Sequence, residues 1–260
     1  MDQSTSDAFP QNSSPTFEWT ILAEESSFLV VNKPTGLLSQ STFGVDSLLF
    51  QIRRYLAARD ANSNEPFVEL PHRIDRGTSG IVLVARNRSA LRQFGEQFHS
   101  RKIVKSYLVA VSGSPASDSD RWHDWMRKIP DVAKAELVAS EAEGGREAVL
   151  SYKSLSRSPS ASVHRVELET GRMHQIRLQF ASRGFPVLGD FAYGSQVPWS
   201  PAPRHDHDEH FALHAASIVF RHPKDGRAIE IEAPLPAAWH REFPDESPKF
   251  GVTSRLLNGL

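Results

Sequence analysis

A loop rich in charged residues leads directly into an apolar strand in this 260-residue chain, and this join limits what the chain can fold into. Residues 72–76 contain one histidine, two arginines and one aspartate, and Thr78 and Ser79 follow them. The segment Gly80–Ala85 then contains only glycine and aliphatic residues, which is typical of a strand with both faces buried. A buried strand holds the side chains of an adjoining loop in place, so we expect a functional site at this join.

Short strands and a few helices account for most of the remaining pattern. Residues 113–148 contain two turn clusters and predict a hairpin or an inserted excursion. The elements do not alternate in a regular strand–helix–strand rhythm, which favours an α+β fold around a central mixed, mainly antiparallel sheet flanked by helices and loops. The expected strands are 27–33, 80–85, 105–112, 150–155, 163–168, 214–220 and 229–232. The expected helices are 48–56 (capped by Asp46 and Ser47), one following Ser89, and 173–180 (ending near Gly184).

The two ends of the chain differ in composition from its middle. Residues 1–16 are rich in serine, asparagine, proline and aspartate and have little to bury, so we expect a disordered tail. Residues 241–260 are expected to form a weakly structured C-terminal tail. A single domain would then cover residues 17–240, which is long enough to bury its own core without disulfides.

Composition excludes several classes of protein. The chain has no cysteine, which excludes disulfides, thiolate metal sites and a cysteine nucleophile, and which fits a reducing cytoplasm. No apolar run approaches the roughly 20 residues of a membrane-spanning helix, and the N-terminus lacks the basic start and apolar block of a secretory signal. A net charge of −1 disfavours indiscriminate coating of nucleic acid. Residues 86–105, with six Lys or Arg against one Glu, nevertheless suit local phosphate contacts.

Four segments of the chain match the motifs of one family in order and spacing. In isolation, Asp75 and its neighbouring arginines would form an ordinary surface ion pair. However, the stretch HRIDRGTSGIVLVAR, residues 72–86, resembles the catalytic motif of RluA-type RNA pseudouridine synthases. The other three matching segments are 30–36, 105–110 and 170–177, and weaker similarities occur at 189–194 and 213–220. The resemblance covers about residues 20–236.

The chain departs from the family's pattern only mildly. Ile74 replaces the usual leucine, which conserves side-chain volume. Gly77 stands where the family often has a polar residue, and Arg86 stands where it often has lysine. None of these changes removes a catalytic group. The space before residue 20 is too short for the S4-type RNA-binding domain that many members carry, so we expect the compact form of the family.

The resemblance implies that the domain at 17–240 isomerises uridines in RNA to pseudouridine. This reaction breaks the N1–C1′ glycosidic bond and rejoins the uracil through C5, so it requires no redox cofactor, metal or ATP. Asp75 is implied as the catalytic carboxylate, either as a nucleophile or as a base at the sugar. Arg177 is implied to pair with Asp75 and orient it. Tyr107 is implied to stack on the uracil and to assist removal of the C5 proton.

Several residues in these motifs are expected to bind the substrate. Arg73 resembles the residue that helps to fill the place of the flipped base, and phosphate binding or charge balance is an equally open role. His174 and Gln175 are expected to contact RNA or to support the site. The expected substrate-binding set is Arg73, Arg76, Arg172, His174 and Gln175. The residues expected to shape the loop are His72, Thr78, Ser79 and Gly80.

RNA is the expected partner, either transfer RNA or ribosomal RNA, and we expect a cytoplasmic monomer with no membrane contact and no obligate protein partner. The alternative is a non-catalytic RNA-binding protein that retains the same fold. The presence of Asp75, Tyr107 and Arg177 together argues against that alternative.

Two other classes of enzyme compete with this interpretation. A metal enzyme could use the histidine-rich segment 205–214, although its spacing matches no hydrolase signature. A glycosidase could use Asp75 and Asp190 as a pair of carboxylates flanking a sugar. Loss of activity on chelation would identify the first, and the placement of the two aspartates would decide the second.

Overall fold

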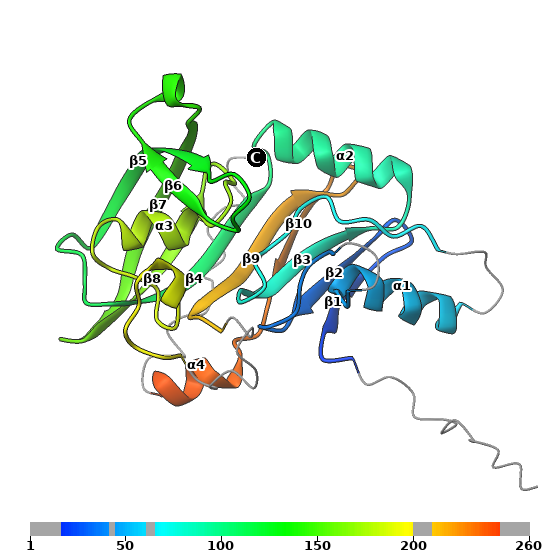
Figure 1. The fold of residues 1–260 in the computed structure, drawn as a ribbon. Coiled ribbons are helices and arrows are strands. Elements are labelled where there is room, and N and C mark those ends of the chain that lie inside the picture. The colour runs from blue at the N-terminus through cyan, green and yellow to red at the C-terminus, as the bar shows by residue number, and fades with distance from the viewer. Residues whose placement is uncertain (1–16, 42–44, 61–65, 200–209, 245–260) are drawn as a thin grey trace, which may run out of the picture.

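The computed structural model describes residues 17–41, 45–60, 66–199 and 210–244. Ten strands form one sheet, and helices lie against it (Figure 1). The strands are β1 (Thr20–Glu24), β2 (Phe28–Lys33), β3 (Ser79–Ala85), β4 (Val104–Ser112), β5 (Ser119–Lys128), β6 (Ala135–Val138), β7 (Arg146–Arg157), β8 (Ala161–Leu168), β9 (Leu213–Arg221) and β10 (Ala228–Glu232). The helices are α1 (Leu48–Arg59), α2 (Arg88–His99), α3 (Gln175–Ala181) and α4 (Ala237–Glu242), with short 3-10 turns η1 (Glu141–Glu143) and η2 (Phe191–Tyr193).

The sheet is mixed and mainly antiparallel, which confirms the predicted α+β class. Neighbouring strands follow the order β1-β2-β3-β9-β4-β8-β7-β5-β6, and β10 pairs with β9 beside this path. All these pairs are antiparallel except β3 and β9, which run parallel at the centre of the sheet. The segment 113–148 forms the predicted hairpin, β5 and β6, which extends the sheet beyond β7.

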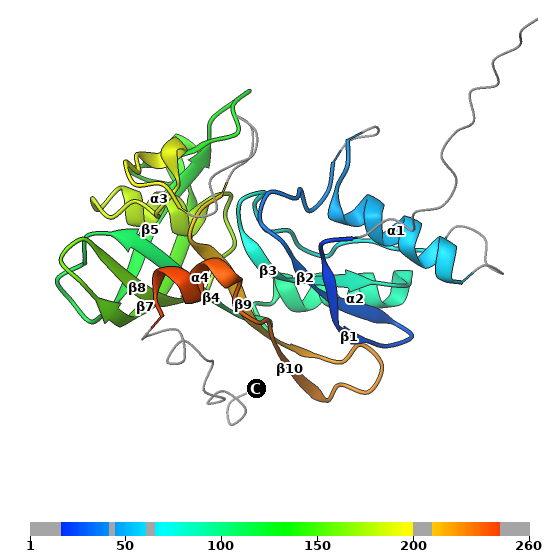
Figure 2. The same ribbon diagram turned by 90° about the horizontal axis from the view of Figure 1, so that it is seen from below.

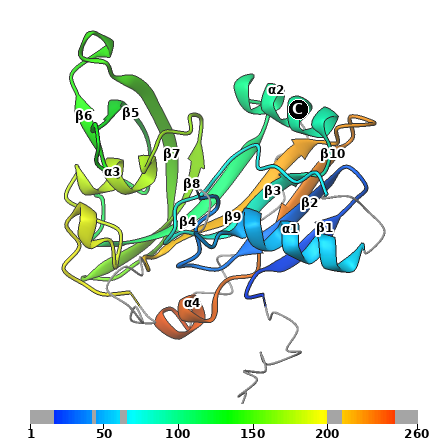
Figure 3. The same cartoon turned by 45° about the vertical axis from the view of Figure 1, so that its right-hand side comes forward.

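Helices α1 and α2 cover opposite faces of β2 and β3 (Figures 2 and 3). Helix α1 begins after Ser47, whose hydroxyl accepts a hydrogen bond from the amide of Phe50, so the predicted cap is confirmed. Its buried side chains recur at every fourth position and pack on one face of the sheet. Helix α2 begins one residue before Ser89 and buries Phe94 on the other face. All seven residues of β3 are buried, as the apolar run predicted.

Gly80 allows β3 and β9 to meet. Its φ of +107° favours glycine, and it lies opposite Ala215 in the parallel pair. A Cβ atom at this position would lie 2.2 Å from the carbonyl oxygen of Ala215. Only a glycine therefore lets the backbones approach closely enough to pair, and this junction fixes the start of β3 directly after the charged loop.

Helix α3 is shorter than the predicted helix 173–180. The helix begins only at Gln175, because the preceding residue, His174, has a left-handed φ of 55°. Met173 therefore lies outside the helix. The C-terminal end agrees with the prediction: Gly184 has a φ of +85°, and its amide donates to the carbonyl of Ala181. The rings of Phe180 and Trp122 pack together with their centroids 4.7 Å apart, and this contact holds α3 against β5.

Helix α4 lies at the predicted boundary between the domain and the C-terminal tail. Its first four residues belong to the predicted domain 17–240, which contained no predicted helix there, and it ends at Glu242. The rings of Trp199, Trp239 and Phe243 pack against one another with centroids 5.3–6.2 Å apart. Packing of these three rings stabilises a short helix that has little propensity of its own, which is why local sequence patterns did not predict it. The remainder, 245–260, and the predicted tail 1–16 lie outside the described residues.

Among the helices of the described residues, none is both long enough and apolar enough to cross a membrane.

Candidate active site

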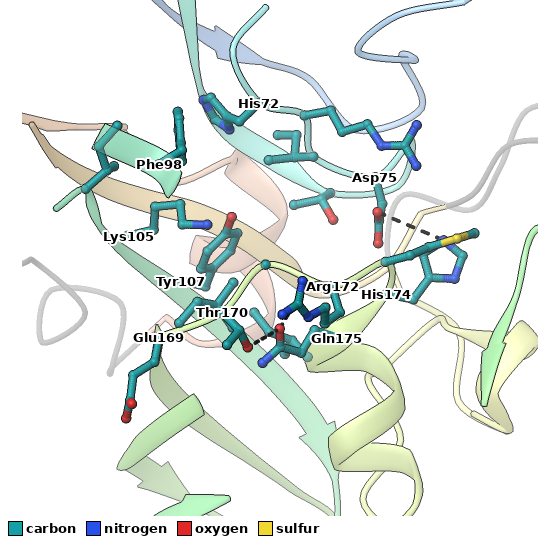
Figure 4. Close-up of a pocket in the computed structure, with 18 of the residues that line it drawn as sticks. His72, Asp75, Phe98, Lys105, Tyr107, Glu169, Thr170, Arg172, His174 and Gln175 are labelled. Carbon is teal, nitrogen blue, oxygen red and sulfur yellow. Dashed lines mark hydrogen bonds and ion pairs between the residues drawn. The ribbon is translucent and has the colours of Figure 1, made fainter. Parts of the chain in front are cut away.

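A cavity of about 750 Å³ opens beside the centre of the sheet (Figure 4). Its walls come from the loop before β3, the end of α2, β4, and the segment between β8 and α3. Segments far apart in the sequence therefore meet at one place. The predicted site residues that line it are Arg73, Asp75, Tyr107, Arg172, His174, Gln175 and Arg177, whereas Arg76 is not among its lining residues.

Arg177 joins two carboxylates at the floor of the cavity. Its Nη1 lies 3.3 Å from Oδ2 of Asp75, as the predicted pairing required. Its Nε and Nη2 donate to the two carboxylate oxygens of Asp190 at 2.6 and 2.9 Å. The side chains of Arg177 and Asp190 are each only 1% exposed, whereas that of Asp75 is 25% exposed. The buried bidentate pair therefore holds the guanidinium still, and Asp75 is the carboxylate that remains accessible.

Asp190 acts as a support for Arg177 in this geometry, which argues against the glycosidase alternative. Both of its oxygens accept hydrogen bonds from Arg177, and the guanidinium also contacts Asp75. A glycosidase requires both carboxylates to face the sugar. The match of Gly189-Asp190 to the family pattern could have marked Asp190 as a site residue. It could not have shown that Asp190 binds Arg177.

The end of β2 and the segment that follows it hold the Asp75 loop in place. Lys33 is fully buried, and its Nζ donates to the carbonyls of Pro34, Leu37 and Arg76 at 2.8, 2.7 and 3.1 Å. Burial lowers the pKa of Lys33 to about 7, and the nearby Asp75 carboxylate opposes that effect. This function of the Asn-Lys-Pro segment was not predicted from the sequence.

Further hydrogen bonds join the same two segments. The hydroxyl of Ser39 donates to the carbonyl of Ile74 at 2.7 Å and accepts from its amide at 3.2 Å. The Nε atom of Arg76 donates to the carbonyl of Gly36 at 2.9 Å. Arg76 thus braces the loop, which explains why its side chain does not line the cavity. The predicted contact of Arg76 with RNA is not favoured by this position, because the side chain points to Gly36 and not into the cavity.

Tyr107 and Lys105 lie side by side on β4, since residues two apart point to the same face of a strand (Figure 4). Burial, with a smaller contribution from the charge of Asp75, raises the pKa of the Tyr107 phenol above its ordinary value. Burial lowers the pKa of Lys105 to about 8. The Lys105 ammonium lies 5.6 Å from the centre of the Phe98 ring, and no carboxylate of the described residues pairs with it. The cavity therefore holds a neutral phenol beside an unpaired cation.

The predicted substrate residues at the start of α3 and in the segment before it also form internal hydrogen bonds. Gln175 is buried: its Oε1 accepts from the Thr170 hydroxyl at 2.9 Å and from the amide of Arg172 at 3.0 Å. The Nε of Arg172 donates to the carbonyl of Glu147 at 2.7 Å. These contacts shape the cavity wall. Arg73, by contrast, is exposed at the cavity's edge, where it can reach a bound molecule.

His72 supports the loop, as predicted for a scaffold residue. Its Nε2 accepts a hydrogen bond from the amide of Leu83 at 2.9 Å, and its ring packs on Phe98 with centroids 5.0 Å apart. Burial, aided by the charge of Lys105, lowers the pKa of His72 to about 3. The imidazole is therefore neutral near pH 7 and can accept the bond.

The histidine-rich segment divides between described and undescribed residues. His205 and His207 lie outside the described residues. His214 is buried in β9, where its Nδ1 lies 2.9 Å from the Ser79 hydroxyl. Within the described ranges, no group of three or more His, Cys, Asp or Glu side chains is placed to hold a metal ion.

Comparison with known proteins identifies the family. Residues 27–182 match the RNA pseudouridylate synthase family, and the chain belongs to that family. The ribosomal large subunit pseudouridine synthase C of Buchnera aphidicola subsp. Acyrthosiphon pisum is 31% identical over 227 residues, which cover 87% of this chain and 70% of that protein. The protein of the same name from Haemophilus ducreyi is 35% identical over 224 residues, which cover 84% and 66%. The chain thus spans about two thirds of the length of these curated relatives.

Solved structures share the fold. Human RNA Pseudouridylate Synthase Domain Containing 4 superposes with a TM-score of 0.68 at 21% identity, covering 85% of this chain and 92% of that one. Human RNA Pseudouridylate Synthase Domain Containing 1 gives a TM-score of 0.65 at 22% identity, covering 86% and 87%. At these identities the similarity concerns the fold alone, and it confirms the predicted synthase architecture.

Proposed function

We propose that this chain isomerises specific uridines of large-subunit ribosomal RNA to pseudouridine, with Asp75 as the catalytic carboxylate. The observation that carries this proposal is the accessible Asp75 carboxylate, held by the buried Arg177 and facing the same cavity as Tyr107. The two relatives described above are both named for the large ribosomal subunit. Those names favour ribosomal RNA over transfer RNA as the substrate.

The proposed reaction is balanced without a co-reactant. The N1–C1′ bond of the uridine breaks, the uracil turns, and a C5–C1′ bond forms. The C5 atom loses its proton and N1 gains one, so nothing is oxidised or reduced. Asp75 acts at the sugar or the base, and Arg177 keeps its carboxylate oriented while the uracil moves. A cavity of about 750 Å³ has room for a nucleotide taken out of its stack.

Tyr107 and Arg73 have distinct roles in this proposal. The Tyr107 ring forms part of the cavity wall on which a uracil can stack, and its phenol stays protonated because burial raises its pKa. The hydroxyl oxygen can then take the C5 proton only as the phenol passes its own proton on, and N1 of the uracil is the atom that gains a proton overall. Arg73, exposed at the edge, takes the place of the flipped base or contacts a phosphate.

Release of tritium from RNA labelled at uridine C5 tests the proposed function. Wild-type protein should release tritium from large-subunit ribosomal RNA, and Asp75→Asn, which keeps the shape of the side chain, should lower the rate by at least about 1,000-fold. The RNA affinity of Asp75→Asn should stay within a fewfold of that of wild type, which serves as the folding control. Turnover by Asp75→Asn close to the wild-type rate would exclude the mechanism. No release of tritium with wild type, with RNA binding intact, would instead favour the non-catalytic RNA-binding alternative.

A cytoplasmic monomer completes the proposal, since ribosomal RNA is the substrate class and the cavity is formed by one chain. Analytical ultracentrifugation should give the mass of one chain for the free protein, and the mass of one chain plus one RNA for the complex. A stable dimer in the absence of RNA would contradict this part of the proposal.

A further inference from the structure

His174 lies between the catalytic carboxylate and a tyrosine that the proposed mechanism does not use. Its Nε2 is 4.0 Å from Oδ1 of Asp75 (Figure 4). On the other side of the ring, its Nδ1 is 3.0 Å from the hydroxyl of Tyr193. The backbone of His174 is left-handed, with a φ of 55°, a conformation that costs free energy in a residue other than glycine. The surrounding structure therefore maintains this placement of the ring.

The hydrogen bonds of Tyr193 assign the direction of its hydroxyl proton. The backbone amide of Ala135 donates to the Tyr193 oxygen at 2.9 Å. That bond uses a lone pair of the hydroxyl and leaves its proton to be donated. Two acceptors are within reach: Nδ1 of His174 at 3.0 Å and the carbonyl of Ala135 at 3.5 Å. The shorter bond, to His174, is the stronger one. Burial raises the pKa of Tyr193, which keeps this proton in place.

The tautomer of His174 follows from this direction. Burial lowers the pKa of His174, and the charges of Arg177 and Arg73 act in the same sense, whereas Asp75 and Asp190 oppose them. The ring is therefore neutral near pH 7 and carries one proton. Since Nδ1 accepts from Tyr193, that proton is on Nε2, and it points toward Oδ1 of Asp75.

We propose that Tyr193 is a positioning residue that fixes His174 in the Nε2–H tautomer, so that His174 and Arg177 present one donor to each oxygen of Asp75. Arg177 faces Oδ2 at 3.3 Å and His174 faces Oδ1 at 4.0 Å. The second contact is longer than a hydrogen bond, and contacts of this kind tighten when substrate is bound. This inference rests on the proposed function of Asp75 and adds a reason why the carboxylate keeps one orientation.

The β5–β6 hairpin takes part in this arrangement. Ala135, the first residue of β6, supplies the amide that holds the Tyr193 hydroxyl. The Lys134 ammonium and the Arg177 guanidinium lie 5.6 and 5.0 Å from the centre of the Tyr193 ring. Contacts made by RNA with the hairpin would therefore reach Asp75 through only two side chains, Tyr193 and His174.

Nitrogen-15 NMR of histidine-labelled protein reads the tautomer directly and does not depend on turnover. The His174 signals, assigned by their loss in His174→Gln, should show a protonated Nε2 and an unprotonated Nδ1 in wild type. Tyr193→Phe should shift both signals toward a mixture of the two tautomers. Tyr152→Phe, which removes a hydroxyl that donates to Ser117 outside the cavity, is the matched control and should leave the signals unchanged. A protonated Nδ1 in wild type, or wild-type signals in Tyr193→Phe, would overturn the inference.

Kinetics on large-subunit ribosomal RNA supply the second readout. Tyr193→Phe should lower kcat by about tenfold with KM within twofold, because the change affects the orientation of Asp75 and not the grip on RNA. In the His174→Gln background, Tyr193→Phe should have little further effect, since both variants break the same contact. Fully multiplicative losses would mean that Tyr193 acts elsewhere. If wild type shows no turnover at all, the proposed function fails, while the NMR result still decides the tautomer.

Discussion

Two of the cations that line the cavity, Arg177 and Lys105, differ in their partners. Arg177 is buried and satisfied by two carboxylates, so it holds geometry. Lys105 is partly buried and has no carboxylate partner in the part of the chain that the structure describes, and burial lowers its pKa to about 8. A buried cation without a counter-charge is costly unless a ligand supplies one. The phosphate of an RNA chain is the anion that a synthase would bring to this position.

Lys105→Gln should therefore weaken RNA binding in a salt-dependent way. A lost phosphate contact reduces the slope of log K against log salt by about 1. Fluorescence anisotropy of labelled large-subunit ribosomal RNA fragments, measured from low to high KCl, would give the slope. Lys102→Gln removes the same charge from an exposed residue outside the cavity lining and should change the slope less. Equal slopes for wild type and Lys105→Gln would exclude the phosphate contact.

At the scale of elements, the junction between β3 and β9 has the least tolerance for change. The charged loop, the strand and the partner strand meet at Gly80, where a Cβ atom would lie 2.2 Å from a backbone oxygen. Because that oxygen belongs to the paired strand, it cannot move aside without loss of the pairing. The position of Asp75 thus depends on a glycine five residues later.

Gly80→Ala should lower the free energy of unfolding by about 3 kcal/mol or more, from the clash and the positive φ together. Urea unfolding followed by circular dichroism would measure the change. Gly95→Ala is the matched control, because no atom lies within 4 Å of its added Cβ and it sits within α2. That variant should raise the stability by about 0.5–1 kcal/mol. A Gly80→Ala protein as stable as wild type would show that the junction can relax.

At the scale of the whole molecule, buried histidines make stability depend on pH. Burial lowers the pKa of His72 to about 3 and those of His164 and His214 to about 4. Each is neutral when folded and has an ordinary pKa near 6.5 when unfolded. Between these values the unfolded chain binds more protons, so stability rises with pH there. The contribution of these neutral histidines to the free energy of unfolding is fully present above about pH 6.5. It is lost as the pH falls from there toward 4.

Unfolding measured between pH 7 and pH 5 should show this loss, at about 2 kcal/mol for each buried histidine by pH 5. His164→Gln should have a shallower pH dependence than wild type, even if it is less stable at pH 7. Replacing the exposed His99 with glutamine should keep the wild-type slope. A His164→Gln slope equal to that of wild type would contradict the assignment.

The sequence by itself determined the strand pattern, the sheet class and most of the residues that meet in the cavity. Periodicity is a local property, so the apolar run of β3 and the cap at Ser47 could be read directly. The family motifs pointed to Asp75, Tyr107 and Arg177 together. Helix α4 was not predicted from the sequence. Its order comes from an aromatic cluster with Trp199, which is distant in the chain.

Only the tertiary structure decided which partner each polar group takes. Arg76 and Arg73 flank Asp75 almost symmetrically in sequence, yet Arg76 turns to the carbonyl of Gly36 and Arg73 stays exposed at the cavity. Asp190 supports Arg177, and Tyr193 holds His174, through bonds between segments that are 13 and 19 residues apart. Hydrogen bonds and burial depend on distances of a few ångströms in space, and those distances exist only once the sheet has brought the segments together.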